Sequence, residues 1–151
     1  MMVALPLHIV AAMIWVGGMF FAYMALRPVA ATLLEPPFRL ALWSQVFARF
    51  FHWVWAAVLI LPTTGLWMIF VELGGMKNTG GYIHVMLLLG IIMIALFLHV
   101  FFAHYRKLNA VLAVNNIPAA GHQLNKIRRL IGINLILGLI ITVVASAGRF
   151  T

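Results

Sequence analysis

Four long apolar runs, separated by short polar segments, dominate the pattern of hydrophobic and polar positions along the chain. We place them at about residues 5–26, 43–71, 82–105 and 129–147, and each is long enough for an α-helix to cross a bilayer. The pattern predicts an all-α integral membrane protein, with four transmembrane helices in one four-helix bundle over residues 1–151. The first run follows no basic segment and exceeds a typical secretory signal, so we expect it to be retained.

Composition supports this class. Of the 151 residues, 66% are hydrophobic and 8% are charged, whereas about a quarter of a soluble domain is charged. The absence of cysteine excludes disulfides and thiolate ligands. The net charge of +8 could indicate nucleic-acid binding, but the basic residues flank the apolar runs and form no separate basic domain. We therefore expect a lipid bilayer as partner and no nucleic acid.

The basic residues also predict an orientation. Both termini lie on one side of a bundle with four spans. Eight of the ten basic residues fall in or beside the connections on the other side, namely Arg27, Arg39, Arg49, Arg106, Lys107, Lys126, Arg128 and Arg129. The side of the termini holds Lys77 and Arg149. The positive-inside rule then predicts a bacterial inner-membrane protein with both termini on the periplasmic side.

The histidines are the candidate functional residues, because ionisable side chains inside a span usually have a function. His84 and His99 both belong to the third run, about 60° apart around an ideal helix and roughly 22 Å apart along it. The predicted topology gives each a partner at its own depth, His8 for His84 and His52 for His99. His104 and His122 fall at the interface, where ordinary solvation explains them.

Two imidazoles from two helices could ligate a b-type haem, which also needs aromatic walls and small residues where the ring approaches. The aromatic residues around His52 provide such walls, Gly17, Gly18 and Gly90 provide the small residues, and Arg49 could hold a propionate. Our leading hypothesis is a protein with one or two haems b, which transfers electrons between a quinone or periplasmic reductant and an acceptor. An oxidoreductase activity and a homo-oligomer are both compatible with this hypothesis.

Three alternatives remain. Histidine and methionine could instead bind copper, with thioether ligands among Met13, Met19, Met24, Met86 and Met93. The same histidines could serve only to bridge helices or to lie at an interface. The chain could also be a structural or interaction protein without a cofactor.

Three segments resemble a known family: LHIVAAMIWVGGMFF, YIHVMLLLGIIMIALFLHVFFAHYRKL and RRLIGIN. They are similar to the copper resistance protein D superfamily, which includes the HemJ-type protoporphyrinogen oxidases. The resemblance implies haem or copper handling in a bacterial inner membrane, and His8 matches a histidine implicated in HemJ haem ligation. Met86 and Leu135 stand where the HemJ-type pattern has lysine and glutamate, which argues against porphyrinogen oxidation.

Overall fold

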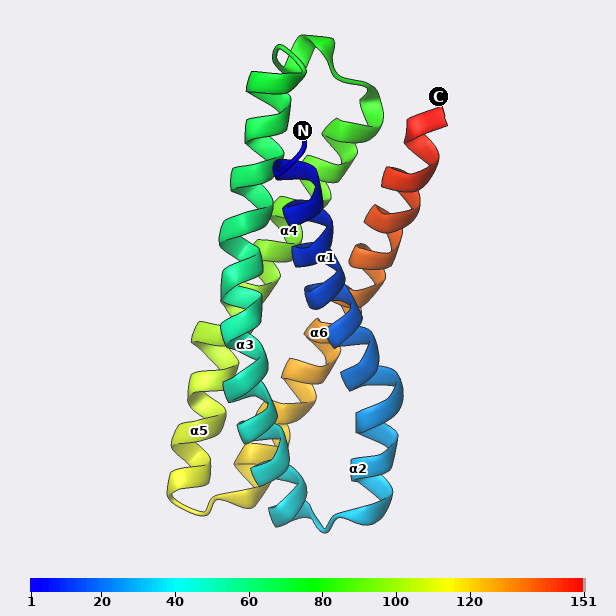
Figure 1. The fold of residues 1–151 in the computed structure, drawn as a ribbon. Coiled ribbons are helices and arrows are strands. Elements are labelled where there is room, and N and C mark those ends of the chain that lie inside the picture. The colour runs from blue at the N-terminus through cyan, green and yellow to red at the C-terminus, as the bar shows by residue number, and fades with distance from the viewer. Residues whose placement is uncertain (151) are drawn as a thin grey trace.

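The computed structural model describes residues 1–150 except the side chain of Arg149. The side of the bundle on which the Arg149 charge is predicted to lie therefore falls outside the described part of the chain. Four long helical segments make up the fold (Figure 1), and no strand occurs in residues 1–150. The first segment comprises α1 (Ala4–Phe21), the π-helical turn η1 (Ala22–Leu26) and α2 (Arg27–Leu33); the second comprises α3 (Pro36–Trp67) and the π-helical turn η2 (Met68–Glu72). After the 3₁₀ turn η3 (Met76–Asn78), the third comprises α4 (Gly81–His99), the π-helical turn η4 (Val100–Tyr105) and α5 (Arg106–Ala113). The fourth is α6 (Ile117–Ala147), followed by the 3₁₀ turn η5 (Gly148–Phe150).

Each of the four segments is long and apolar enough to cross a membrane. They hold 30, 37, 33 and 31 residues, about 45–55 Å of helix, whereas the hydrocarbon core of a bilayer is about 30 Å thick. The helices therefore extend beyond the predicted spans. The first helix, for example, continues through Arg27 and Pro28, beyond the span predicted at residues 5–26, and ends at Leu33. Pro28 is tolerated because it lies in the first turn of α2, where a missing N–H costs little.

The segments pack as a bundle in which α1 lies against α3, and α4 and α5 lie against α6. The contacts of α6 with both α1 and α3 join the two pairs. Figure 1 shows both termini at the end that also carries the α3–α4 connection, while the α2–α3 and α5–α6 connections lie at the opposite end. The sequence clusters most basic residues around these two connections. We call this the basic end of the bundle.

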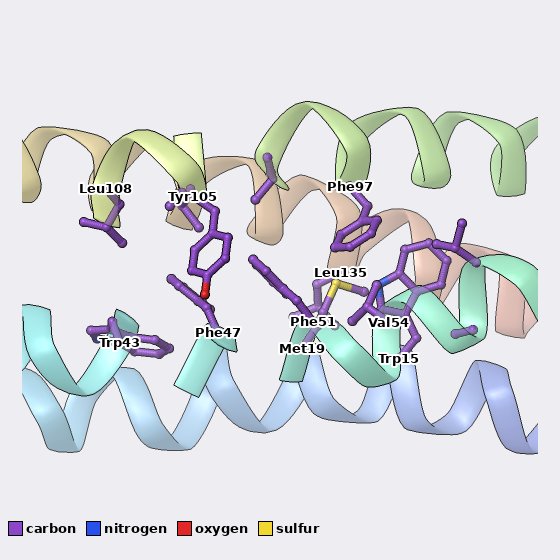
Figure 2. Close-up of a cluster of buried hydrophobic side chains, with 14 of the residues drawn as sticks. Trp15, Met19, Trp43, Phe47, Phe51, Val54, Phe97, Tyr105, Leu108 and Leu135 are labelled. Atoms are coloured by element: carbon purple, nitrogen blue, oxygen red, sulfur yellow. The ribbon is translucent and has the colours of Figure 1, made fainter. Parts of the chain in front are cut away.

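An aromatic cluster fills the centre of the bundle (Figure 2). The Phe51 ring stacks on Phe47 at a centroid distance of 5.1 Å and meets Tyr105 and Phe97 edge-on at 5.0 and 5.4 Å. These are favourable geometries for aromatic pairs. The opposite face of α3 carries apolar side chains outward, and Trp53 is 62% exposed. Apolar residues on the outside are expected where lipid surrounds the protein.

Small residues set the closest helix contacts. A Cβ atom added to Gly18 would lie 2.3 Å from the Phe50 ring, and one added to Gly138 would lie 2.8 Å from Val16. The equivalent positions at Gly17 and Gly90 meet nothing within 4 Å. Of the three glycines expected beside a ligand, Gly18 is thus closely approached, and its neighbour is a protein side chain.

Candidate metal centre

His8 lies half-buried between α1 and α3. Its Nδ1 is 2.8 Å from the Thr64 hydroxyl, and that hydroxyl donates to the carbonyl of Ile60. A hydroxyl that has already donated its proton can only accept, so the His8 Nδ1–H donates to it. Gly65 makes room for the ring, since a Cβ there would lie 3.4 Å from it. The bond joins two helices and satisfies one polar atom of His8 inside the bundle.

His84 and His52 face outward, and among the described residues each ring bonds only to the backbone carbonyl four residues before it. The Nδ1 of His84 contacts the Gly80 carbonyl at 3.3 Å, and the Nδ1 of His52 contacts the Ala48 carbonyl. Both side chains are exposed, as is Arg49. Within residues 1–150, neither predicted pair, His8 with His84 or His52 with His99, is joined by a hydrogen bond. Haem ligation by these pairs stays a prediction.

The structure instead brings His99 and His104 together. Their Nε2 atoms are 3.2 Å apart, and their rings are perpendicular with centroids 4.9 Å apart. His104 also places its Nδ1 3.0 Å from Oε1 of Gln123, a residue of α6 that is 4% exposed. The three side chains form a chain from the exposed His99 to the buried Gln123, across the contact between the third and fourth segments.

The π-helical turn η4 produces this pairing. In an ideal α-helix, residues five positions apart point about 140° away from each other. A π-helical turn closes its hydrogen bond over five residues, so such residues lie one above the other. The bond from the Arg106 N–H to the Phe101 carbonyl shows this five-residue spacing directly. Turns of this kind often occur at functional sites.

Gln123 determines which nitrogen of His104 carries a proton. An amide oxygen only accepts, so the Nδ1–H of His104 must donate to it, which leaves the Nε2 lone pair directed at His99. In this state, His99 can donate its own Nε2–H to that lone pair. If His99 instead holds its proton on Nδ1, the Nε2 lone pairs of both histidines face each other at 3.2 Å. A cation bound between the two nitrogens would stabilise this arrangement. A histidine that donates its second N–H to a protein acceptor is the usual arrangement of a metal ligand.

The His99–His104 pair offers a cation two imidazole nitrogens as ligands. In the described part of the chain, no three histidine, cysteine or acidic residues come together in a way that could hold a metal ion. Imidazole suits zinc, copper, iron and nickel, but structural zinc sites are nearly always four-coordinate and catalytic ones have three protein ligands. Two imidazoles suit an ion that accepts few ligands, as copper(I) does.

The sequence pointed to His99 as a candidate ligand but to neither of its two neighbours in the structure. His104 was attributed to ordinary solvation at the interface, and Gln123 was not predicted. The spacing of two histidines by five residues was visible, but it indicates proximity only if the helix contains a π-helical turn. Of the five methionines considered as thioether ligands, Met19 and Met93 are buried in the core, Met86 is half-buried, and Met13 and Met24 are exposed.

Comparison with known proteins assigns the chain to a family. The model of the copper resistance protein D family matches residues 44–147, well over half of the chain. The match includes His99, His104 and Gln123 but not His8. The searches of curated proteins and of solved structures gave no match. The four-helix membrane protein described here belongs to the copper resistance protein D family.

Proposed function

We propose that this protein handles copper in the membrane and that His99 and His104 bind a copper(I) ion. The observation that carries the proposal is the 3.2 Å approach of the two Nε2 atoms, with the His104 proton held on the far side of its ring by Gln123. The family to which the chain belongs is named for copper resistance, which supports copper over other metals that imidazole binds.

The geometry is compatible with a shared ion. If the ion lies about 2.0 Å from each nitrogen, as zinc does in imidazole sites, a separation of 3.2 Å corresponds to an N–metal–N angle of roughly 105°. This angle leaves room for a third ligand, which a donor or acceptor of the ion could supply. An incomplete set of protein ligands favours binding that is reversible enough for transfer.

The positive charge around the proposed site favours a monovalent ion over a divalent one. The exposed Arg106 and Lys107 follow the site in sequence, and the chain has only two acidic residues. A positive surrounding opposes a divalent ion about twice as strongly as a monovalent one, although salt screens exposed charges. By the positive-inside rule, this end of the bundle would face the cytoplasm of a bacterial cell, where copper is kept reduced.

The copper and haem hypotheses share His99, so other residues must separate them. Copper binding through the observed pair requires His104 and not His52, whereas the inner haem predicted from sequence requires His52 and not His104. The test is an anaerobic titration of the purified protein with copper(I) against a chromophoric chelator, with an optical spectrum of the same preparation.

We expect the wild-type protein to bind one copper(I) ion. His104→Ala should weaken binding by more than about tenfold, because it removes one of two ligands. His52→Ala and His84→Ala serve as matched controls, since each removes an exposed imidazole that, among the described residues, bonds only to a backbone carbonyl four residues before it. Equal losses in His52→Ala and His104→Ala would contradict the site. A six-coordinate haem spectrum lost in His52→Ala would favour the haem hypothesis instead.

A further inference from the structure

The basic end of the bundle contains a cavity. This cavity of about 730 Å³ opens between the first segment near η1 and α2, the start of α3 and the start of α6. This volume falls in the range of small-molecule sites, about 300–1,000 Å³. None of the described residues that line it is a histidine, so it is separate from the proposed copper site.

Three arginines from three different helices line this cavity: Arg27, Arg39 and Arg128. Arg27 is held over the Tyr23 ring, with its guanidinium carbon 4.7 Å from the centroid. Arg27 and Arg39 are half-buried, and Arg128 is exposed. Three guanidinium groups around one hollow therefore form a strongly cationic site.

Within the described residues, no carboxylate forms an ion pair with these arginines. The chain contains only two acidic residues, and neither lines the cavity. Glu72 pairs with the amino terminus, and Glu35 is exposed and forms no ion pair within the described residues. Half-buried cations without a counter-charge are costly, and a bound anion would remove much of that cost.

The remaining walls are mostly apolar and include Trp43, Phe47 and Ile131. A ligand that fits must therefore join an anionic group to an apolar part. The depth of the cavity in the membrane agrees with such a ligand. Arg27 lies about 35 Å along the helix from Ala4, just beyond the span of a hydrocarbon core about 30 Å thick. Lipid phosphates occupy that level, and basic pockets between transmembrane helices bind acidic lipid headgroups.

We propose that the cavity binds one anionic phospholipid, whose phosphate lies among Arg27, Arg39 and Arg128 while an acyl chain follows the apolar walls. The bound lipid would tie α2 to the start of α3 and of α6, three elements that meet around the cavity. The inference does not depend on copper binding, because the two sites share no residue.

The test uses the delipidated full-length protein in detergent, titrated with dioleoyl phosphatidylglycerol, with dioleoyl phosphatidylcholine and with inorganic phosphate. Binding is followed by native mass spectrometry. We expect one phosphatidylglycerol per chain, with phosphatidylcholine much weaker. Arg27→Gln and Arg39→Gln should each weaken phosphatidylglycerol binding about fivefold, the equivalent of about 1 kcal/mol for one cation at a charged surface.

Arg129→Gln and Arg106→Gln are the matched controls, because both residues are exposed basic residues outside the cavity. They should leave phosphatidylglycerol binding unchanged. Arg27→Lys keeps the charge and should retain most of the affinity, which separates loss of the anion site from loss of the fold. Equal binding of the two lipids, or equal losses in Arg129→Gln and Arg27→Gln, would overturn the proposal. Inorganic phosphate that competes fully at the same concentration as the lipid would also overturn it.

Discussion

Replacing Gln123 by leucine tests the copper site without removing either imidazole. The substitution keeps a side chain of similar size in the bundle but removes the oxygen that accepts the His104 Nδ1–H at 3.0 Å. Because Gln123 is 4% exposed, water does not readily take over that role. His104 can then avoid an unpaired N–H by moving its proton to Nε2, which is the atom proposed to bind copper.

The expected loss of copper affinity follows from the competition between the two positions of the His104 proton, Nδ1 and Nε2. Leaving a buried donor unsatisfied costs about 1–3 kcal/mol, and binding copper would force His104 back into this state. Loss of such a supporting partner typically lowers metal affinity 10–100-fold, which agrees with the upper part of this range. We therefore expect Gln123→Leu to weaken copper(I) binding by about 10–100-fold in the anaerobic chelator competition.

Gln123→Glu is the matched variant, because its carboxylate still accepts the Nδ1–H and adds a negative charge. It should bind copper(I) at least as tightly as the wild-type protein. A Gln123→Leu variant with wild-type copper affinity, or equal losses of affinity in both variants, would contradict a role for Gln123 in holding the His104 proton. Helical circular dichroism and the elution volume must match the wild-type protein for the comparison to hold.

Three substitutions, two of them paired with a control substitution, test the packing by thermal unfolding in one detergent. Gly18→Ala should destabilise the bundle by about 1–3 kcal/mol, because the new methyl group overlaps a ring, whereas Gly17→Ala enters open space and should not. Phe51→Ala should lower the stability of the bundle by about 2–3 kcal/mol. This is less than the roughly 3–5 kcal/mol typical of soluble proteins, because lipid solvates apolar groups as well as the core does. Trp53→Ala, on the outward face of α3, is its control. Asn134→Leu should stabilise the bundle by about 1 kcal/mol, because Oδ1 of Asn134 is buried and has no hydrogen-bond partner among the described residues. Asn134 also lines a cavity of about 20 Å³.

Each of these has a contradicting outcome. Similar melting temperatures for the two glycine variants would mean that the helices separate readily. A Trp53→Ala variant as unstable as Phe51→Ala would mean that this face of α3 is covered by protein. A destabilised Asn134→Leu would show that the amide makes a needed bond, such as the 3.3 Å contact from its Nδ2 to the Met93 carbonyl.

The number and character of the helices followed from sequence because about 20 apolar residues are enough to identify a span. The helix ends could not be predicted in the same way. Polar residues such as Arg27 and Lys126 are expected where the hydrocarbon core ends, but the backbone continues as helix through both positions. A change in solvent along the chain is not a change in secondary structure.

The orientation of single histidines was harder to predict, because the apolar runs are apolar on every side. His52 is adjacent to Phe51 in sequence, yet Phe51 faces the core and His52 faces outward. The spacing of Phe47, Phe51 and Val54 is a helical stripe that could have identified the buried face. The predicted topology gave the depth of His52 in the membrane, but the depth of a helical residue and the direction in which its side chain points are independent.

The π-helical turn η4 also bears on how relatives of this protein should be aligned. Such a turn amounts to one extra residue within a helix, so all that follows it is rotated by about 100° relative to an uninterrupted α-helix. A relative that lacks the extra residue would need a one-residue gap between His99 and Arg106. Aligned without that gap, it could show a histidine in the column of His104 that points away from α6. Identity in that column would then not imply a shared site.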